Sequence, residues 1–250
     1  MRFALYEPDQ SDNRPVVFFL SGLTCNEQNF IQKSGFQQYA SENKIIIICP
    51  DTSPRGESIP VSENWKLGQG ASFYVNAEKK PWSKNFQMYD YITKELPELI
   101  SKEFNYNSTI AGIFGHSMGG CGAIQCALKN QNYFKSLSAI SPICSFKKSN
   151  LAEIAIENYF EKNSKSIENY DPLSLIKKNN FFYDDILIDV GLDDEFLDQL
   201  NIDEFYENYL ASNNKITLRK HKSFGHNYFF VHTFIKDHIS FHVKKLEKFL

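Results

Sequence analysis

Short apolar runs alternate along the chain with longer segments in which apolar residues recur every three or four positions. The runs predict strands at 16–20, 45–49, 110–114, 137–140, 186–190 and 216–218. All but the last are almost continuously apolar, as is typical of parallel strands that helices cover on both faces. The pattern therefore predicts an α/β fold of three layers, with a mostly parallel central sheet between helices.

The segments between the runs predict helices. Apolar residues between Phe86 and Leu99 have helical spacing, and Pro97 within them predicts a kink or a break. A second helix is expected from Cys121 and a closing helix from Phe230. Residues 143–184 are polar and helical in character, so we expect them to cross the carboxyl edge of the sheet.

The segment 52–81 is rich in Gly, Ser, Asn and Pro, and it predicts a loop. A loop of that length in a compact domain is usually functional. No internal repeat, low-complexity tract or linker divides the sequence. We therefore expect one domain over residues 1–250.

Composition excludes several classes of protein. The chain has 250 residues, of which 42% are hydrophobic, so it can fill one large core. A net charge of −3 without clustered Lys and Arg argues against nucleic acid as a partner. No apolar run has the length of a membrane span, and the N-terminus has no apolar signal core, so we expect no membrane contact and a cytoplasmic location. The five cysteines lack the spacing of a disulfide framework or a zinc site, and we expect no metal.

The segment after the strand at 110–114 has the pattern of a catalytic site. It reads Gly115-His116-Ser117-Met118-Gly119 and runs into the predicted helix. Gly-x-Ser-x-Gly between a strand and a helix is the nucleophile elbow of the α/β-hydrolase fold, in which a strained turn exposes the serine hydroxyl. We therefore expect Ser117 to be a nucleophile. The alternative is a glycine-rich turn with an incidental serine.

A serine hydroxyl needs a base, and in this fold an acid and then a histidine follow the serine along the chain. His226 lies in a glycine-supported loop after the last predicted strand, and we expect it to be the base, with His221 as the nearest alternative. The acid is expected after the strand at 186–190, where Gly191 ends the strand. We predict Asp194, with Asp193 as the alternative.

An oxyanion hole needs two N–H groups that point at the developing negative charge. One is expected from Met118, directly after the nucleophile. The other is expected from Leu23, in the loop after the strand at 16–20, where Gly22 permits a close approach of the backbone. The alternative for this loop is a simple turn.

Long motifs of the chain resemble S-formylglutathione hydrolases, also called esterase D. They comprise LSGLTCNEQNF at 20–30, PDTSPRG at 50–56, FYV at 73–75, PW at 81–82, GHSMGG at 115–120 and DILID at 185–189 running into Asp193 and Asp194. They follow one another in the family's order over nearly the whole chain. The resemblance implies the α/β-hydrolase fold, no metal or organic cofactor, and hydrolysis of S-formylglutathione to glutathione and formate in formaldehyde detoxification.

The family's functional residues fall on matching positions. Its triad falls on Ser117, Asp194 and His226, and its oxyanion donors fall on Leu23 and Met118. Members are cytoplasmic and often dimeric, so the resemblance implies a homodimer.

Further positions fall near the expected site. Cys25 matches a family cysteine that makes such enzymes thiol-sensitive, and we interpret it as modulatory because it lacks an elbow and a matched base. Trp65, Trp82 and Tyr228 are expected to line the substrate pocket, with ordinary core packing as the alternative.

The sequence also departs from the family. Its first residues resemble a strand that lies further into typical members, so we expect the family's N-terminal edge hairpin to be absent; a misassigned start codon would explain this equally well. Asn227 stands where a serine is usual, and Lys66 where an acid is common.

Three other functions are compatible with these residues. The same triad would serve a general short-chain carboxylesterase or an acyltransferase that uses an alcohol in place of water. The third alternative is a non-catalytic binding protein with the hydrolase fold, although such a protein has no need of an intact Ser, Asp and His.

Overall fold

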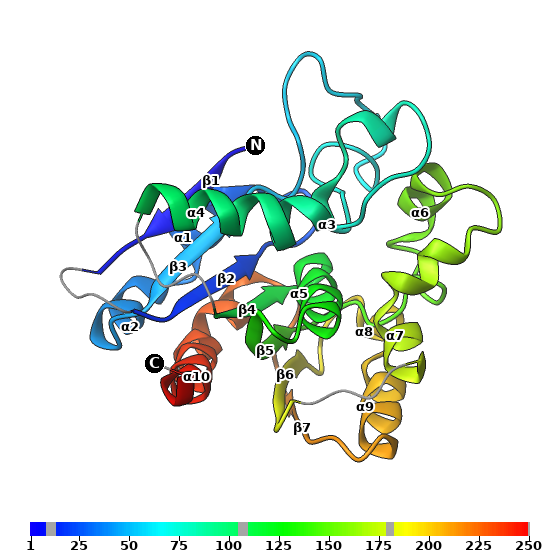
Figure 1. The fold of residues 1–250 in the computed structure, drawn as a ribbon. Coiled ribbons are helices and arrows are strands. Elements are labelled where there is room, and N and C mark those ends of the chain that lie inside the picture. The colour runs from blue at the N-terminus through cyan, green and yellow to red at the C-terminus, as the bar shows by residue number, and fades with distance from the viewer. Residues whose placement is uncertain (9–13, 105–109, 179–182, 250) are drawn as a thin grey trace.

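A computed structural model describes residues 1–8, 14–104, 110–178 and 183–249 (Figure 1). Its described strands form one sheet in the order β1-β3-β2-β4-β5-β6-β7. β1 pairs antiparallel with β3, and every other pairing is parallel. The strands are β1 (Phe3–Tyr6), β2 (Val16–Leu20), β3 (Ile46–Pro50), β4 (Ala111–His116), β5 (Phe134–Ile140), β6 (Ile186–Gly191) and β7 (Ile216–His221).

The prediction of a mostly parallel α/β sheet is confirmed, and all six predicted strands are present. Their ends differ by a few residues, because β4 continues to His116 and β7 to His221, while β5 begins at Phe134. The strand that the apolar pattern does not show is β1, whose four residues are only half-buried at the edge of the sheet.

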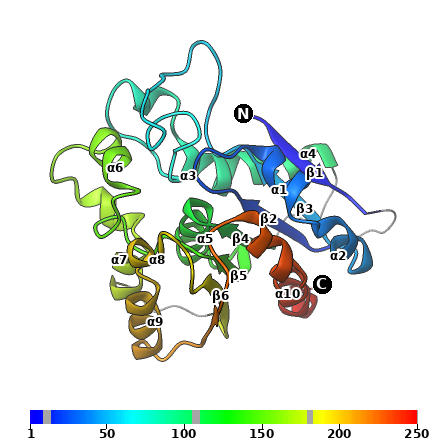
Figure 2. The ribbon, with the colours of Figure 1, turned by 180° about the vertical axis from the view of Figure 1, so that it is seen from behind.

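Each face of the sheet packs against its own helices, as Figures 1 and 2 show. Val17 and Phe19 belong to one core, and Phe18 and Leu20 of the same strand belong to the other, because side chains alternate along a strand. The first core includes residues of α1 (Glu27–Lys33), α2 (Phe36–Glu42) and α10 (Tyr228–Leu246). The second includes residues of α4 (Leu96–Phe104) and α5 (Met118–Lys129).

The helical segment around Pro97 is continuous and not broken, and its irregularity lies just before the proline. α3 (Met88–Asp90) is followed by a π-helical turn, η2 (Tyr91–Glu95), and then by α4. Pro97 lies in the first turn of α4, directly after the π-helical turn, and it has no N–H to donate to an intrahelical hydrogen bond.

Two helices begin earlier than expected. α5 begins at Met118, three residues before Cys121, directly after the turn at Ser117. α10 begins at Tyr228 because the side chain of Asn227 accepts the N–H of Phe229 at 3.0 Å and so caps the helix.

Helices α6 (Glu153–Tyr159), η3 (Lys165–Asn169) and α7 (Pro172–Lys178) lie within the predicted excursion at 143–184, of which 179–182 lie outside the described residues. The segment 52–81 is a loop beside α6 (Figure 1). Tyr159 of α6 holds this loop through two hydrogen bonds. The Tyr159 hydroxyl donates to the carbonyl of Ala71 and accepts the N–H of Gly68, both at 2.9 Å. The remaining helices are η1 (Trp82–Lys84), α8 (Leu197–Leu200), α9 (Ile202–Ala211) and η4 (Glu247–Phe249). Within the described residues, no helix is long and apolar enough to span a bilayer.

Candidate active site

Ser117 occupies the sharp turn between β4 and α5. Its backbone angles, φ 58° and ψ −120°, lie in a region that residues other than glycine rarely adopt. Hydrogen bonds hold the turn: its N–H donates to the carbonyl of Ile140 at 3.0 Å, and its carbonyl accepts the N–H groups of Cys121 and Ile143. The side chain therefore lies at the N-terminus of a twelve-residue helix, where negative charge is favoured.

Glycines make the close packing around this turn possible. A Cβ on Gly119 would overlap the carbonyl of Leu20, and a Cβ on Gly115 would overlap the carbonyl of Gly119. Gly22 approaches from the loop after β2, and a Cβ there would lie 3.2 Å from the Cβ of Ser117. The loop that carries Leu23 is thus in contact with the turn that carries Ser117.

Asp194 and His226 are hydrogen-bonded to each other. Oδ2 of Asp194 lies 2.7 Å from Nδ1 of His226. Because a carboxylate can only accept, Nδ1 carries the hydrogen, and Nε2 is left as the basic nitrogen. Burial raises the pKa of Asp194, but the hydrogen bond and charge of His226, with the N–H of Phe196, outweigh it and hold the pKa below its usual range. The carboxylate therefore stays ionised at neutral pH.

The ring of His226 is held from two sides. The ring of Phe196 meets it edge-on at 5.0 Å between centroids, and the ring of His116 packs against it at 4.7 Å. His116 immediately precedes Ser117, so this contact places His226 beside the Ser117 turn. Burial is the main cause that lowers the pKa of His116 to about 3, so its ring is neutral at ordinary pH.

The alternative acid and base lie elsewhere. Nε2 of His221 is 3.4 Å from Asp189, and its ring packs on Phe234 at 3.9 Å. The Asp193 side chain is exposed. Among the candidates, the structure thus pairs Asp194 with His226, and not Asp193 or His221.

Two main-chain donors are available at the serine. Within the described part of the chain, neither the N–H of Leu23 nor that of Met118 has a protein acceptor, whereas the neighbouring Thr24 donates to the carbonyl of Gly70 at 2.9 Å. Met118 is the first residue of α5, whose N–H has no partner within the helix. The arrangement can therefore accept an oxyanion beside Ser117.

Cys25 and Tyr228 lie together beside this loop. Burial raises the pKa of the Cys25 thiol and outweighs the nearby cations Lys33 and Arg55. The thiol is therefore protonated at neutral pH and a weak nucleophile. The ring of Tyr228 is 5.8 Å from that of His116, so Tyr228 lies against the buried histidine that precedes Ser117.

The two tryptophans are less closely tied to the site. Trp82 is buried and packs edge-on against Phe86 at 5.1 Å and Tyr159 at 5.6 Å, which agrees with the alternative of core packing. Trp65 is 49% exposed, and the ammonium of Lys66 lies 5.4 Å from the centre of its ring.

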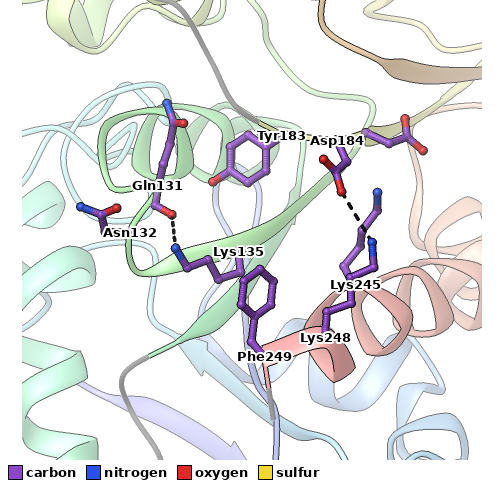
Figure 3. Close-up of a pocket in the computed structure, with 9 residues that line it drawn as sticks. Gln131, Asn132, Lys135, Tyr183, Asp184, Lys245, Lys248 and Phe249 are labelled. Atoms are coloured by element: carbon purple, nitrogen blue, oxygen red, sulfur yellow. Dashed lines mark hydrogen bonds and ion pairs between the residues drawn. The ribbon is translucent and has the colours of Figure 1, made fainter.

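A separate cavity of about 250 Å³ lies at the opposite end of the sheet (Figure 3). Lys135 and Tyr183, which line it, stand where β5 and β6 begin, whereas Ser117, Asp194 and His226 follow the ends of their strands. This cavity is therefore not part of the serine site. In the described part of the chain, no three His, Cys, Asp or Glu side chains are grouped to hold a metal ion.

Besides Phe196, two residues that contact His226 were not assigned from the sequence. Glu195 accepts the main-chain N–H of His226 at 3.2 Å, and His116 packs under its ring. The only signal for Glu195 was its place after Asp193 and Asp194 in a run of acids, and runs of acids are common on surfaces.

Comparisons with known proteins agree with this geometry. The esterase family model described as "Putative esterase" matches residues 1–241. The S-formylglutathione hydrolases of Mus musculus and Rattus norvegicus are 45% and 44% identical to the chain, over 98% of the chain and 89% of each relative. A solved structure of an S-formylglutathione hydrolase from Agrobacterium tumefaciens is 41% identical with a TM-score of 0.95, and the match covers 98% of the chain and 89% of that structure.

Proposed function

The chain belongs to the S-formylglutathione hydrolase family of esterases, and we propose that it hydrolyses S-formylglutathione to glutathione and formate. The observation that carries the chemistry is the strained Ser117 turn beside the hydrogen-bonded pair of Asp194 and His226. That arrangement suits acyl transfer through a covalent serine intermediate. The identity to family members along the chain supports the choice of substrate.

In the first half-reaction, Nε2 of His226 takes the proton of the Ser117 hydroxyl, and the serine oxygen attacks the formyl carbonyl. The N–H groups of Leu23 and Met118 hold the oxyanion of the tetrahedral intermediate. When the carbon–sulfur bond breaks, the imidazolium returns its proton to the departing thiolate. Glutathione leaves, and Ser117 carries a formyl ester.

In the second half-reaction, water takes the place of the thiol. His226 removes a proton from the water as its oxygen attacks the ester, and returns that proton to Ser117 as the ester bond breaks. Formate leaves and the free serine is restored. Asp194 stays ionised throughout, holds the Nδ1–H tautomer and stabilises the imidazolium.

Burial at the serine supports a small acyl group. Ser117 is only 5% exposed, and Gly22 lies directly against it. A formyl group is the smallest acyl group, so exclusion of bulk is a sufficient means of selection on the acyl side.

We further propose that the protein acts in formaldehyde detoxification in the cytoplasm, as a homodimer. All five cysteines are free thiols, which agrees with a reducing compartment. The homodimer rests on the family resemblance, and sedimentation of the purified protein tests it by its mass.

The function is tested by comparing three substrates on the purified protein: S-formylglutathione, S-acetylglutathione and p-nitrophenyl acetate. The proposal expects kcat/KM to be highest for the formyl thioester. Rapid ester hydrolysis with slow turnover of the formyl thioester would instead assign a general short-chain carboxylesterase.

A further inference from the structure

Glu195 contacts the same histidine as Asp194 does, but at a different point. Its Oε2 accepts the main-chain N–H of His226 at 3.2 Å, while Oδ2 of Asp194 bonds the ring at Nδ1. Two consecutive acids on the loop after β6 therefore hold one histidine on the loop after β7, at its main chain and at its side chain.

The loop that carries His226 has few other main-chain bonds at this point. The carbonyl of Phe224 accepts the N–H of Asp193 at 3.0 Å, and the next bond is that from Phe230 to Asn227 at 3.1 Å, where α10 begins. Among the described residues, Glu195 is the acceptor for the His226 N–H. Its bond thus bridges the stretch between the end of β7 and the start of α10.

Gly225, directly before His226, lies close to the loop after β6. A Cβ on Gly225 would lie 3.3 Å from the carbonyl oxygen of Asp193 and 3.4 Å from Oε2 of Glu195. The loop after β6 therefore lies directly against the main chain that precedes the base.

The other contacts of His226 restrain its ring and not its N–H. Phe196 and His116 pack against the ring, and Asp194 bonds its Nδ1. The titratable groups that face His226 are Asp194 and Glu195 from the loop after β6 and His116 from the end of β4. Of these three, Glu195 alone is exposed to solvent.

We propose that Glu195 is a positioning residue for the general base. Its carboxylate fixes the main chain of His226, so that Nε2 keeps its alignment with the Ser117 hydroxyl through both proton transfers. Small displacements of a catalytic group lower the rate strongly, because the reaction depends on near-contact geometry. This inference rests on the proposed catalytic functions of Ser117, Asp194 and His226.

The test uses three variants of the full chain. Glu195→Ala removes the acceptor, Glu195→Gln keeps an acceptor oxygen without the charge, and Asp193→Ala removes the neighbouring exposed charge. For each, kcat and KM are measured with S-formylglutathione and with p-nitrophenyl acetate, together with the rate of labelling by a fluorophosphonate and the melting temperature.

Loss of one hydrogen bond is expected to lower kcat and the labelling rate of Glu195→Ala by about tenfold, with KM within about twofold. Glu195→Gln is expected to recover most of the rate, and Asp193→Ala to match the wild type. All three are expected to melt within a few degrees of the wild type, because both side chains are exposed.

Three results would overturn the inference. One is a Glu195→Ala variant as fast as the wild type, and another is a Glu195→Gln variant as slow as Glu195→Ala. The third is a change in KM with kcat unchanged, which would indicate contact with substrate. A wild-type protein that neither labels nor turns over either substrate would instead refute the proposed function.

Discussion

Arg219 holds the buried carboxylate of Asp189 through two hydrogen bonds, from Nε to Oδ1 at 2.6 Å and from Nη2 to Oδ2 at 2.5 Å. Nε2 of His238, on α10, lies 3.3 Å from the same carboxylate, and Nδ1 of His238 lies 2.7 Å from Oγ of Ser138, on β5. Burial opposes the charge on Asp189, but its bonds to His238 and Arg219 outweigh burial and keep its pKa well below the usual range. This network ties β5, β6, β7 and α10, and the loops that carry Asp194 and His226 extend from these elements.

Removal of Arg219 should therefore destabilise the fold. Arg219→Ala removes two hydrogen bonds from the buried Asp189 carboxylate, which keeps His238 as a partner, and we expect the free energy of unfolding to fall by about 1–3 kcal/mol. Urea denaturation measures the change. The control is Lys220→Ala, which breaks the exposed pair with Asp203 and is expected to cost at most about 1 kcal/mol. Equal losses in the two variants would contradict the structural importance of the buried pair.

The buried His116 predicts sensitivity to acid. Its pKa is about 3 in the folded state, below the unfolded value of about 6.5. Above the unfolded pKa neither state binds the proton, and between the two values only the unfolded state does, so stability is lost as the pH falls through this window. We expect His116→Phe to reduce the slope of unfolding free energy against pH by about 1.4 kcal/mol per pH unit between about pH 4 and pH 6. An unchanged slope, measured by denaturant titration, would contradict the neutral buried ring.

The two neighbouring acids should differ sharply in their effect on catalysis. Asp194→Asn cannot hold the Nδ1–H tautomer of His226, and we expect kcat to fall by about 10²- to 10⁴-fold. The exposed Asp193 does not contact the ring, and Asp193→Asn should stay within about twofold of the wild type, because surface substitutions have small effects. Steady-state hydrolysis of p-nitrophenyl acetate distinguishes the two variants. The reverse order of effects would assign the acid to Asp193.

How much of the structure the sequence predicts depends on how far apart along the chain the residues of each pattern lie. The buried parallel strands and the turn at Ser117 are predictable because an apolar run and a Gly-x-Ser-x-Gly motif are local patterns. The apolar pattern does not predict the edge strand β1, because its four half-buried residues form a strand through their pairing with β3. Asp189 lies within a predicted strand, and its partners Arg219 and His238 lie 30 and 49 positions away, so no spacing could identify them.

In the candidate site, too, local patterns are predictable and contacts between distant residues are not. The order of serine, acid and histidine predicts the residues that the structure groups, because the fold dictates that order. Glu195 and His116 contact His226 from separate elements of the fold, so these contacts were found only in three dimensions. The sequence left two possibilities for Trp82, pocket lining and core packing, because its partner Tyr159 comes from a distant helix.

A side chain at Gly22 should displace the loop that carries Leu23. A Cβ there would lie 3.2 Å from Ser117 Cβ and 3.4 Å from the carbonyl of His116, so the loop must shift by a few tenths of an ångström. Because an oxyanion donor then moves out of line, we expect Gly22→Ala to lower kcat by about tenfold to 10²-fold, with a smaller effect on KM. Kinetics beside a melting curve check this, and an unaltered kcat would argue against the Leu23 N–H as a donor.

The central claim is that Ser117 forms the covalent acyl intermediate. It is tested most directly by treating the wild type and Ser117→Ala with a fluorophosphonate, locating the adduct by peptide mass spectrometry, and measuring hydrolysis of S-formylglutathione by both proteins. We expect one adduct on the peptide that contains Ser117, no labelling of the variant, and a loss of at least about 10⁴-fold in its kcat. Labelling at another residue, or a Ser117→Ala variant that keeps its thioesterase activity within about tenfold of the wild type, would contradict the account.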